Sequence, residues 1–278
     1  AHPVPLLQTM RKTVVDGSNT SGFQRTTLIA TDGVLQTEGG PVGIDVLCLE
    51  EDSARKLDSK LTPDGEIVTW NLDRLGIPLI EIATAPDVKS PDHAKQTSIA
   101  LGRTLRDTRK VRRGLGSIRQ DLNVSIMCGD RVEIKGCQDL EWIPKIIRIE
   151  MARQLHFYRL ANTLRTNHNL PLLSSDRRKE SVSIEQVVKQ ILPHEIIDVS
   201  EAFTSCKSKR VEQGMEEGFV MMALPLPGFS GYIGTKEFDV DGAQLPRLGR
   251  ELAGAAKLAG VAGVYHSDEL PALSLIHI

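Results

Sequence analysis

The alternating pattern in residues 118–137 constrains the fold more than any other stretch, because it predicts a β-hairpin and the face on which each side chain lies. Apolar and polar residues alternate on both sides of a predicted three-residue loop at 128–130. Since strand side chains alternate between faces, a loop of odd length brings like faces together and places Val124 opposite Ile134. The polar face carries Asp121, Asn123, Glu133 and Lys135. In an arbitrary hairpin, such a face is most often simply solvated.

Composition places the chain among ordinary water-soluble domains. It has 278 residues, 40% of them apolar and 25% charged, enough for one large or two ordinary domains. The net charge of −2 gives no overall basic character, so nucleic-acid binding would need local patches. No apolar run reaches membrane-spanning length, no secretory signal is evident, and the four cysteines form no CxxC pair. These features predict a cytoplasmic protein without membrane contact.

Both ends look unusual. Without an initiator methionine, the chain is expected to begin inside a longer protein. Residues 273–278 have no turn, cap or helical period to complete, and we expect them to be a foreign tail.

Periodicity and capping signals predict the main elements. Strands are expected at 44–49, 66–72 and 77–82, helices at 90–114, 140–158, 183–192 and 251–260, and a further strand from residue 261. Ser90-Pro91-Asp92 is a typical helix start. Residues 211–214 are expected to end a linking region.

Acidic residues recur on or just after these strands. They are Glu50, Glu51, Asp52, Glu81, Asp121 and Glu133. Brought together, they would repel one another unless a cation lay between them, and carboxylate oxygens suit Mg²⁺. Arg74, Arg119 and Lys135 could then hold phosphates. The chain has no Walker A motif, and a metal-dependent nuclease or phosphatase would use the same residues. Structural explanations also stay open: residues 50–52 could form an acidic turn, and Glu81 could be a buried ion-pair partner of Arg74 or Lys135.

One face of the helix predicted at 90–114 is basic. It carries Arg103, Arg106, Lys110 and Arg113, with Asp107 the only acid nearby. Either a phosphate-binding stripe or a plain solvated face explains this pattern.

Five motifs together resemble a known family. They are TVVDGSNTSGFQRT (13–26), CLEEDSARKL (48–57), LGIPLIEIATAPD (75–87), RGLGSIRQDLNVSI (113–126) and RVEIKGCQDLEWIP (131–144). In this order they look like the E subunit of archaeal-type glutamyl-tRNA(Gln) amidotransferases, a paralogue of the bacterial B subunit. The resemblance runs through most of residues 13–271.

The resemblance implies an α+β fold, with an antiparallel-sheet cradle that is incomplete at its N-terminus here. It also implies a ligase that converts Glu-tRNA(Gln) to Gln-tRNA(Gln), using ATP and Mg²⁺. ATP would phosphorylate the glutamyl carboxylate, and ammonia from a separate asparaginase-like partner, the D subunit, would displace the phosphate. The protein would therefore belong to a hetero-oligomer.

Site residues follow from the same resemblance. The metal acids would be Glu50, Glu51, Glu81, Asp121 and Glu133, and which of the first two binds metal stays open. Among these residues and their neighbours we expect Glu51, Glu81 and Lys135 in catalysis. We expect Arg74, Arg119 and Lys135 at the ATP phosphates. For tRNA binding we expect Arg103, Arg106, Lys110 and Arg113.

The domain organisation is also an expectation from the family. Residues 1–165 would form the partial cradle, 166–218 a connecting segment that completes it, and 219–272 part of an insertion domain like that of bacterial-type aspartyl-tRNA synthetases. Two other functions stay open: a non-catalytic tRNA-binding module and a metal-dependent phosphohydrolase.

Overall fold

The fold is seen in a computed structural model of the chain. The described residues are 1–63, 65–114, 116–179, 184–191, 195–238 and 242–266. Contacts divide the chain into a first unit, residues 1–120 with 137–144, and a second unit, residues 121–136 with 145–278. The predicted tail at 273–278 lies outside the described residues, and the domain boundaries at 165 and 218 stay predictions.

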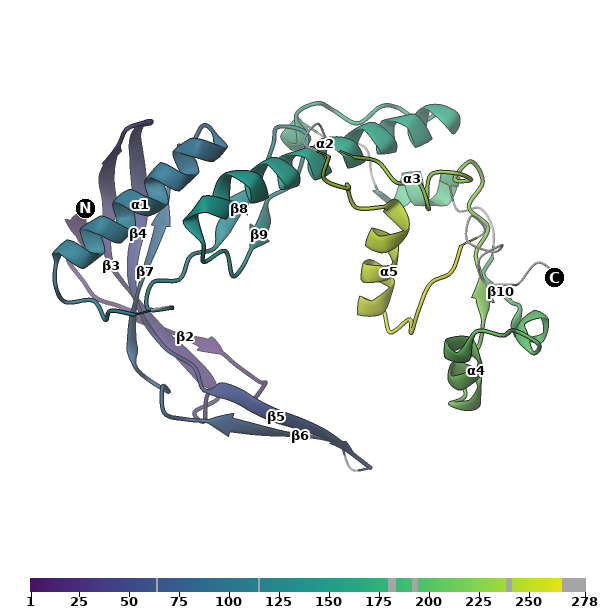
Figure 1. The fold of residues 1–278 in the computed structure, drawn as a ribbon, viewed down its shortest axis with the longest axis horizontal. Coiled ribbons are helices and arrows are strands. Elements are labelled where there is room, and N and C mark those ends of the chain that lie inside the picture. The colour runs from purple at the N-terminus through teal and green to yellow at the C-terminus, as the bar shows by residue number, and fades with distance from the viewer. Residues whose placement is uncertain (64, 115, 180–183, 192–194, 239–241, 267–278) are drawn as a thin grey trace. The chain divides into compact units, whose positions relative to one another are not determined.

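The first unit is built on a five-stranded antiparallel sheet (Figure 1). Its strands are β1 (His2–Pro3), β2 (Thr9–Thr13), β3 (Phe23–Thr37), β4 (Gly40–Glu51) and β7 (Pro78–Thr84). The order is β1-β3-β4-β7, and β2 also pairs with β3. The strands predicted at 44–49 and 77–82 are confirmed as parts of β4 and β7. The long strand β3 was not predicted, although it buries Ala30 and pairs with β4 along most of its length.

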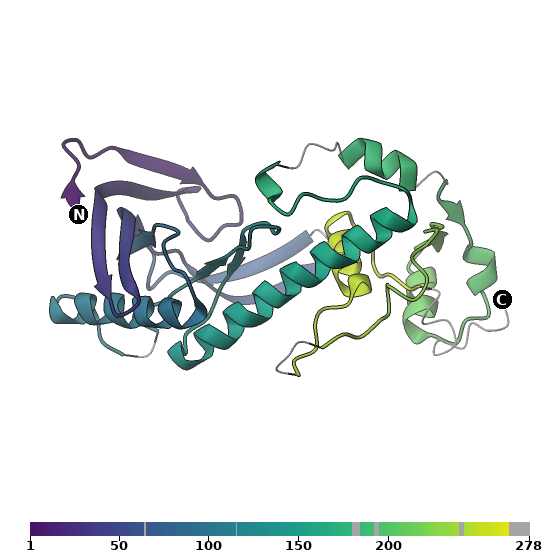
Figure 2. The ribbon, with the colours of Figure 1, turned by 90° about the horizontal axis from the view of Figure 1, so that it is seen from above.

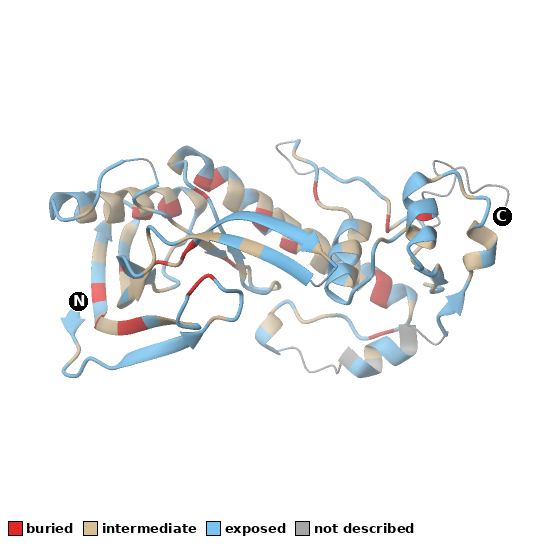
Figure 3. Cartoon of the chain, turned by 90° about the horizontal axis from the view of Figure 1, so that it is seen from below, coloured by how far each residue is buried: buried red, intermediate tan, exposed pale blue. Residues whose placement is uncertain are grey.

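A second, two-stranded sheet follows β4 in the chain. It consists of β5 (Arg55–Thr62) and β6 (Gly65–Asn71), and β6 confirms the strand predicted at 66–72. Most residues of this hairpin are exposed, as the pale colour in Figure 3 shows. Its importance for the site lies at its base, where β5 begins three residues after Asp52.

Helix α1 (Pro91–Asp107) packs against β3. It starts as predicted, because the Ser90 hydroxyl accepts a hydrogen bond from the His93 backbone N–H at 3.1 Å. His93 itself is only 4% exposed, and its Nε2 lies 2.9 Å from Oγ1 of Thr37. This buried contact fixes the first turn of the helix on the end of β3.

Helix α1 ends seven residues before the predicted end at Gly114. Thr108 caps it, and Arg109 then adopts a left-handed backbone with φ of +56°. A left-handed residue directly after the last turn is a common helix terminator. Lys110 and Arg113 therefore lie beyond the helix, so the predicted four-residue basic helix face is wrong in its second half.

The remainder of the first unit is short. It includes the 3₁₀ helix η1 (Leu140–Trp142) and the fully buried Ile143. Lys95 of α1 forms an ion pair of 2.6 Å with Glu141 of η1, which ties this segment to the helix.

In the second unit, the predicted hairpin exists but is shorter and has a different register. Its strands are β8 (Leu122–Val124) and β9 (Val132–Ile134). Val124 lies opposite Val132, not Ile134, so the predicted pairing was wrong by two residues. A shift by two preserves the faces, and the apolar face is confirmed because Val124 is buried.

The side chain of Gln154 explains why the ladder ends at Val124. Its Nε2 donates to the Val124 carbonyl at 3.1 Å, and its Oε1 accepts from the Ile126 backbone N–H at 3.1 Å. These bonds occupy the backbone groups that a longer hairpin ladder would use. Residues 125–131 therefore form a seven-residue loop in place of the three-residue loop expected from the alternation.

Gln154 belongs to α2 (Ile143–Asn167), the long helix that is clearest in Figure 2. It confirms the helix predicted at 140–158 and extends it. Pro144 falls in the first turn, where a missing N–H removes no helical hydrogen bond. Glu150 is buried one turn before Gln154 and is neutralised by Arg153 at 2.7 Å.

The other elements of the second unit are small. They are η2 (Arg177–Lys179), α3 (Ile184–Ile191), β10 (Ile197–Asp198), η3 (Ser200–Phe203), α4 (Lys209–Glu216), β11 (Met222–Ala223) and α5 (Leu248–Leu258). The helices predicted at 183–192 and 251–260 correspond to α3 and α5. Residues 211–214 lie inside α4, and the end of a linking region there stays a prediction. Residues 261–266 form no strand, so the strand predicted from residue 261 was wrong.

Two general predictions can be judged from these elements. All described strand pairs are antiparallel and stand beside separate helices, which confirms the α+β class, whereas the cradle shape stays a prediction. In the described part of the chain, no helix has both the length and the apolar character needed to cross a bilayer.

Candidate functional site

The consecutive residues Glu50 and Glu51 lie in β4, not after it, and therefore point to opposite faces of the sheet. Glu50 forms an ion pair with Lys12 of β2. Glu51 accepts from the Arg25 backbone N–H at 3.1 Å and from its guanidinium Nε at 2.8 Å, with a further contact to Nη2. Each carboxylate is thus engaged by a different cation on a different face.

The Arg25 contact has an electrostatic consequence for Glu51. Hydrogen bonding by the Arg25 side chain stabilises the ionised carboxylate and holds its pKa below the usual value of 4.5. Glu51 is therefore charged at neutral pH. Because Arg25 both lowers its basicity and occupies its oxygens, Glu51 is a poor candidate for a general base.

Asp52 is the only buried acid of the three. It follows β4 directly and is 6% exposed. Its backbone N–H donates to the Ile77 carbonyl at 2.8 Å, and its carbonyl accepts from the Gly76 N–H at 2.9 Å. Gly76 has φ of +79°, a conformation that favours glycine, and these two hydrogen bonds join the turn to the end of β4.

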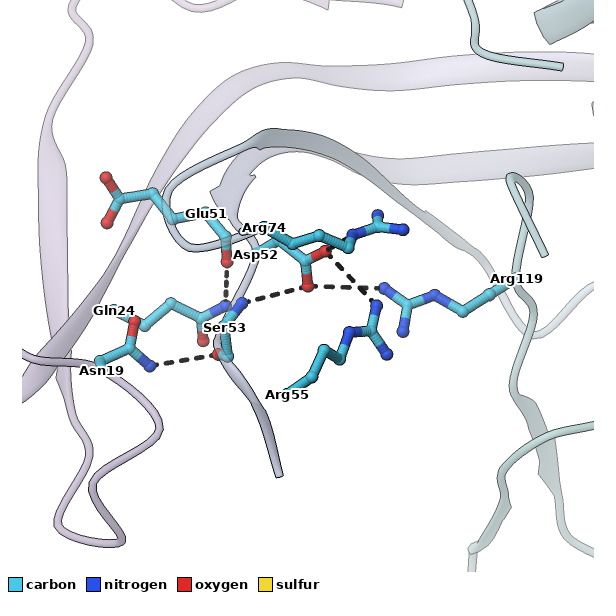
Figure 4. A network of polar contacts seen from close by, with 8 residues as sticks. All are labelled: Asn19, Gln24, Glu51, Asp52, Ser53, Arg55, Arg74 and Arg119. Atoms are coloured by element: carbon cyan, nitrogen blue, oxygen red, sulfur yellow. Dashed lines mark hydrogen bonds and ion pairs between the residues drawn. The ribbon is translucent and has the colours of Figure 1, made fainter. Parts of the chain in front are cut away.

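Three arginines converge on the Asp52 carboxylate, as Figure 4 shows. Oδ2 lies 2.8 Å from Nε of Arg74 and 3.5 Å from Nη2 of Arg55, and Oδ1 lies 3.9 Å from Nη2 of Arg119. Oδ1 also accepts from the Ser53 backbone N–H at 3.1 Å. In the same view, the Glu51 side chain points away from the arginines. We call Asp52, Arg55, Arg74 and Arg119 the arginine cluster.

The structure thus brings the predicted phosphate ligands Arg74 and Arg119 together, within one unit. It adds Arg55, which the sequence reasoning missed. The available signal was its position three residues after Asp52, at the start of the next strand.

Glu81 lies on β7 directly opposite Cys48 of β4. It is exposed, as is its neighbour Ile80, so the expectation of a carboxylate buried in an apolar strand was wrong. Ile80 and Glu81 lie on opposite faces of β7, so both faces of this strand are open at these positions. Burial, followed by the charges of Glu81 and Glu50, raises the pKa of the Cys48 thiol, so both acids lie near enough to that thiol to act on it.

The second unit holds a separate polar group on its hairpin. Nζ of Lys135 lies 3.3 Å from Glu133 and 3.8 Å from Asp121. Hydrogen bonding to Glu133, with the charge of Asp121, raises the pKa of Lys135. All three side chains are substantially exposed, and Lys135 is the common partner of the two acids.

Among the described residues, the predicted metal-binding acids lie in two different units, and neither unit by itself groups them as a magnesium site. No three His, Cys, Asp or Glu side chains there are grouped so that they could hold a metal ion. Glu50, Glu51 and Asp52 are instead engaged by cations of the protein. The predicted Mg²⁺ ligands remain predictions, whereas the arginine cluster suits an anion.

The predicted tRNA-binding residues are all exposed. Arg103 and Arg106 lie on the last turns of α1, and Lys110 and Arg113 lie in the segment after it. That segment also carries Arg109 and Arg112, so basic side chains are dense there despite the loss of the helix. Their role stays a prediction.

Comparison with known proteins places the chain in a family. Residues 2–228 match the family described as the GatB/GatE catalytic domain. The chain belongs to the GatB/GatE family. The resemblance noted in the sequence is thereby confirmed.

Individual relatives agree with this. The chain is 46% identical over 270 residues to a protein of Methanocaldococcus jannaschii, covering 96% of this chain and 38% of that protein. It is 45% identical over 269 residues to one of Methanosarcina acetivorans (97% and 38%) and 45% over 271 residues to one of Pyrococcus furiosus (98% and 39%). All three are named as the E subunit of glutamyl-tRNA(Gln) amidotransferase. The chain thus spans less than two fifths of the length of these relatives.

Proposed function

We propose that this chain forms part of an amidotransferase subunit that converts Glu-tRNA(Gln) to Gln-tRNA(Gln). The family match over residues 2–228 carries this proposal. The reaction replaces a side-chain carboxylate oxygen by nitrogen. ATP would supply a phosphoryl group that turns this oxygen into a leaving group, and ammonia from an asparaginase-like partner subunit would displace it as phosphate.

The chain's own contribution would be to bind and position charged groups. Arg74 and Arg119 would hold phosphate, because guanidinium groups match phosphate oxygens in geometry and charge. Lys135 would face the side-chain carboxylate of the glutamyl group on the tRNA. Glu133 and Asp121 raise the pKa of Lys135 and so favour its cationic form. Phosphoryl transfer depends mainly on such positioning and charge neutralisation.

Glu51 and Glu81, both predicted to act in catalysis, start from different surroundings. Glu51 would have to leave Arg25 before it could contact a metal or substrate. Glu81 is already exposed on β7. Its side chain is therefore accessible from solvent on that strand.

The test is Gln-tRNA(Gln) formation by the full-length protein with its ammonia-producing partner, ATP, Mg²⁺ and Glu-tRNA(Gln). Glu81→Gln should reduce kcat, whereas Asp58→Asn, a matched loss of an exposed carboxylate in the same unit, should not. If both variants form product at the wild-type rate, Glu81 has no part in the reaction. If the wild type binds Glu-tRNA(Gln) but forms no product, the chain belongs to a non-catalytic tRNA-binding module.

A further inference from the structure

The arginine cluster is assembled from three separate segments of the first unit, since Asp52 and Arg55 belong to one of them. Asp52 follows β4, Arg55 begins β5, Arg74 lies in the turn between β6 and β7, and Arg119 lies after α1. The centre is rigid, because the Asp52 backbone is bonded on both sides to residues 76–77. The Arg74 carbonyl accepts from the Ile77 N–H at 3.1 Å, which holds that turn as well.

Charge in the cluster is unbalanced. One carboxylate faces three guanidinium groups, which leaves a local excess of two positive charges. The carboxylate is 8% exposed, whereas the side chains of Arg55, Arg74 and Arg119 are 47%, 36% and 48% exposed. The buried negative centre thus holds cations whose outer parts face solvent.

Donor capacity is also in excess. Each guanidinium has five N–H groups, and one nitrogen of each contacts Asp52. Only the Arg74 contact, at 2.8 Å, is a close ion pair, and the 3.5 and 3.9 Å contacts are loose. Arg55 and Arg119 can therefore turn toward an incoming anion without breaking a strong bond.

We propose that Arg55, Arg74 and Arg119 form a phosphate-binding site that works without a metal ion, and that Asp52 is its positioning residue. Both oxygens of Asp52 already face arginines, so a cation would have to enter between three positive groups. A dianionic phosphate would instead balance the excess charge. This inference deepens the proposed function and rests on it for the identity of the phosphate source.

A nucleotide polyphosphate and the phosphate backbone of tRNA present the same chemistry to the cluster. Tripolyphosphate, which lacks base and sugar, is therefore the probe. Its binding to the full-length protein is measured by calorimetry in EDTA at fixed ionic strength, without tRNA. Competition by metal-free ATP would assign the site to the nucleotide, and competition by uncharged tRNA alone would assign it to the tRNA backbone.

We expect Arg55→Gln to weaken tripolyphosphate binding about tenfold, because it removes one charge-assisted hydrogen-bonding group. Arg55→Lys should bind with intermediate affinity, since lysine keeps the charge but lacks the planar fork. The matched control is Arg178→Gln, which removes a guanidinium that is 85% exposed in the second unit. It should bind as the wild type does.

The proposal fails if the wild type does not bind tripolyphosphate in EDTA, or if Arg55→Gln binds within twofold of the wild type. Circular dichroism establishes whether Arg55→Gln is folded. If it is not, Arg55→Lys decides, and unchanged affinity in that variant overturns the proposal. Product formation is assayed separately, so binding without amidation would contradict the proposed function alone.

Discussion

Asp52→Asn is the most informative single change to the first unit. Asparagine keeps the shape of the side chain but removes the negative charge beneath three guanidinium groups. The main loss is the 2.8 Å charge-assisted bond to Arg74, which is worth about 1.5–3 kcal/mol. The contacts at 3.5 and 3.9 Å involve half-exposed arginines and add little after solvent screening. We therefore expect a loss of about 2 kcal/mol in the free energy of unfolding.

Scanning calorimetry measures this directly. A loss of that size lowers the unfolding temperature of a domain this large by roughly 5–10 °C. Asp58→Asn is the control, because Asp58 is 57% exposed and lies 3.8 Å from Lys60, so its replacement should cost less than about 0.5 kcal/mol. If Asp52→Asn unfolds at the temperature of the control, Asp52 does not organise the cluster and the reasoning is refuted.

Three further predictions concern the hairpin, the sheet and the basic segment. Gln154→Leu should destabilise the second unit by about 2 kcal/mol in urea unfolding, because two backbone groups of the hairpin lose their partner; a change near zero would contradict this. Arg25 lowers the pKa of Glu51, so this pair stabilises the fold above the usual carboxyl pKa of 4.5 and less as the pH falls through the lowered value. The unfolding-temperature advantage of the wild type over Glu51→Gln should therefore shrink in acid, and a constant difference would argue against it. Arg106→Ala and Arg113→Ala should each weaken tRNA binding and reduce its salt slope by about one; an unchanged slope would leave a plain solvated surface.

The hairpin shows what alternation can and cannot predict. The faces of β8 and β9 were predictable, because side-chain alternation depends only on sequence. The length of the ladder was not, because Gln154, which lies well downstream in α2, bonds the backbone groups at its end. A side chain that replaces a ladder bond leaves no trace in the local pattern.

The acids show a similar limit. Their presence near strand ends was predictable, but their partners were not. Lys12 and Arg25 come from strands that the sequence reasoning did not identify, and they engage Glu50 and Glu51. A motif of consecutive acids thus does not reveal which cation each one meets. Arg74 and Arg119 were predicted as phosphate ligands, and the structure explains why they meet: both contact Asp52.

Helix α1 ends earlier than its residue composition predicts. Arginine and lysine favour helices, so the run through Gly114 looked continuous. Arg109 instead adopts a left-handed backbone that ends the helix. Non-glycine residues in this conformation are uncommon, which makes such an end hard to predict.

The central claim is tested most directly by ATP cleavage in the full-length protein with its asparaginase-like partner, with and without Glu-tRNA(Gln). The account predicts Mg²⁺-dependent ATP cleavage only when the charged tRNA is present, with Gln-tRNA(Gln) formed in proportion. Cleavage without tRNA would indicate a phosphohydrolase. No cleavage with every substrate present would contradict an activating enzyme and leave the arginine cluster without a phosphoryl-transfer role.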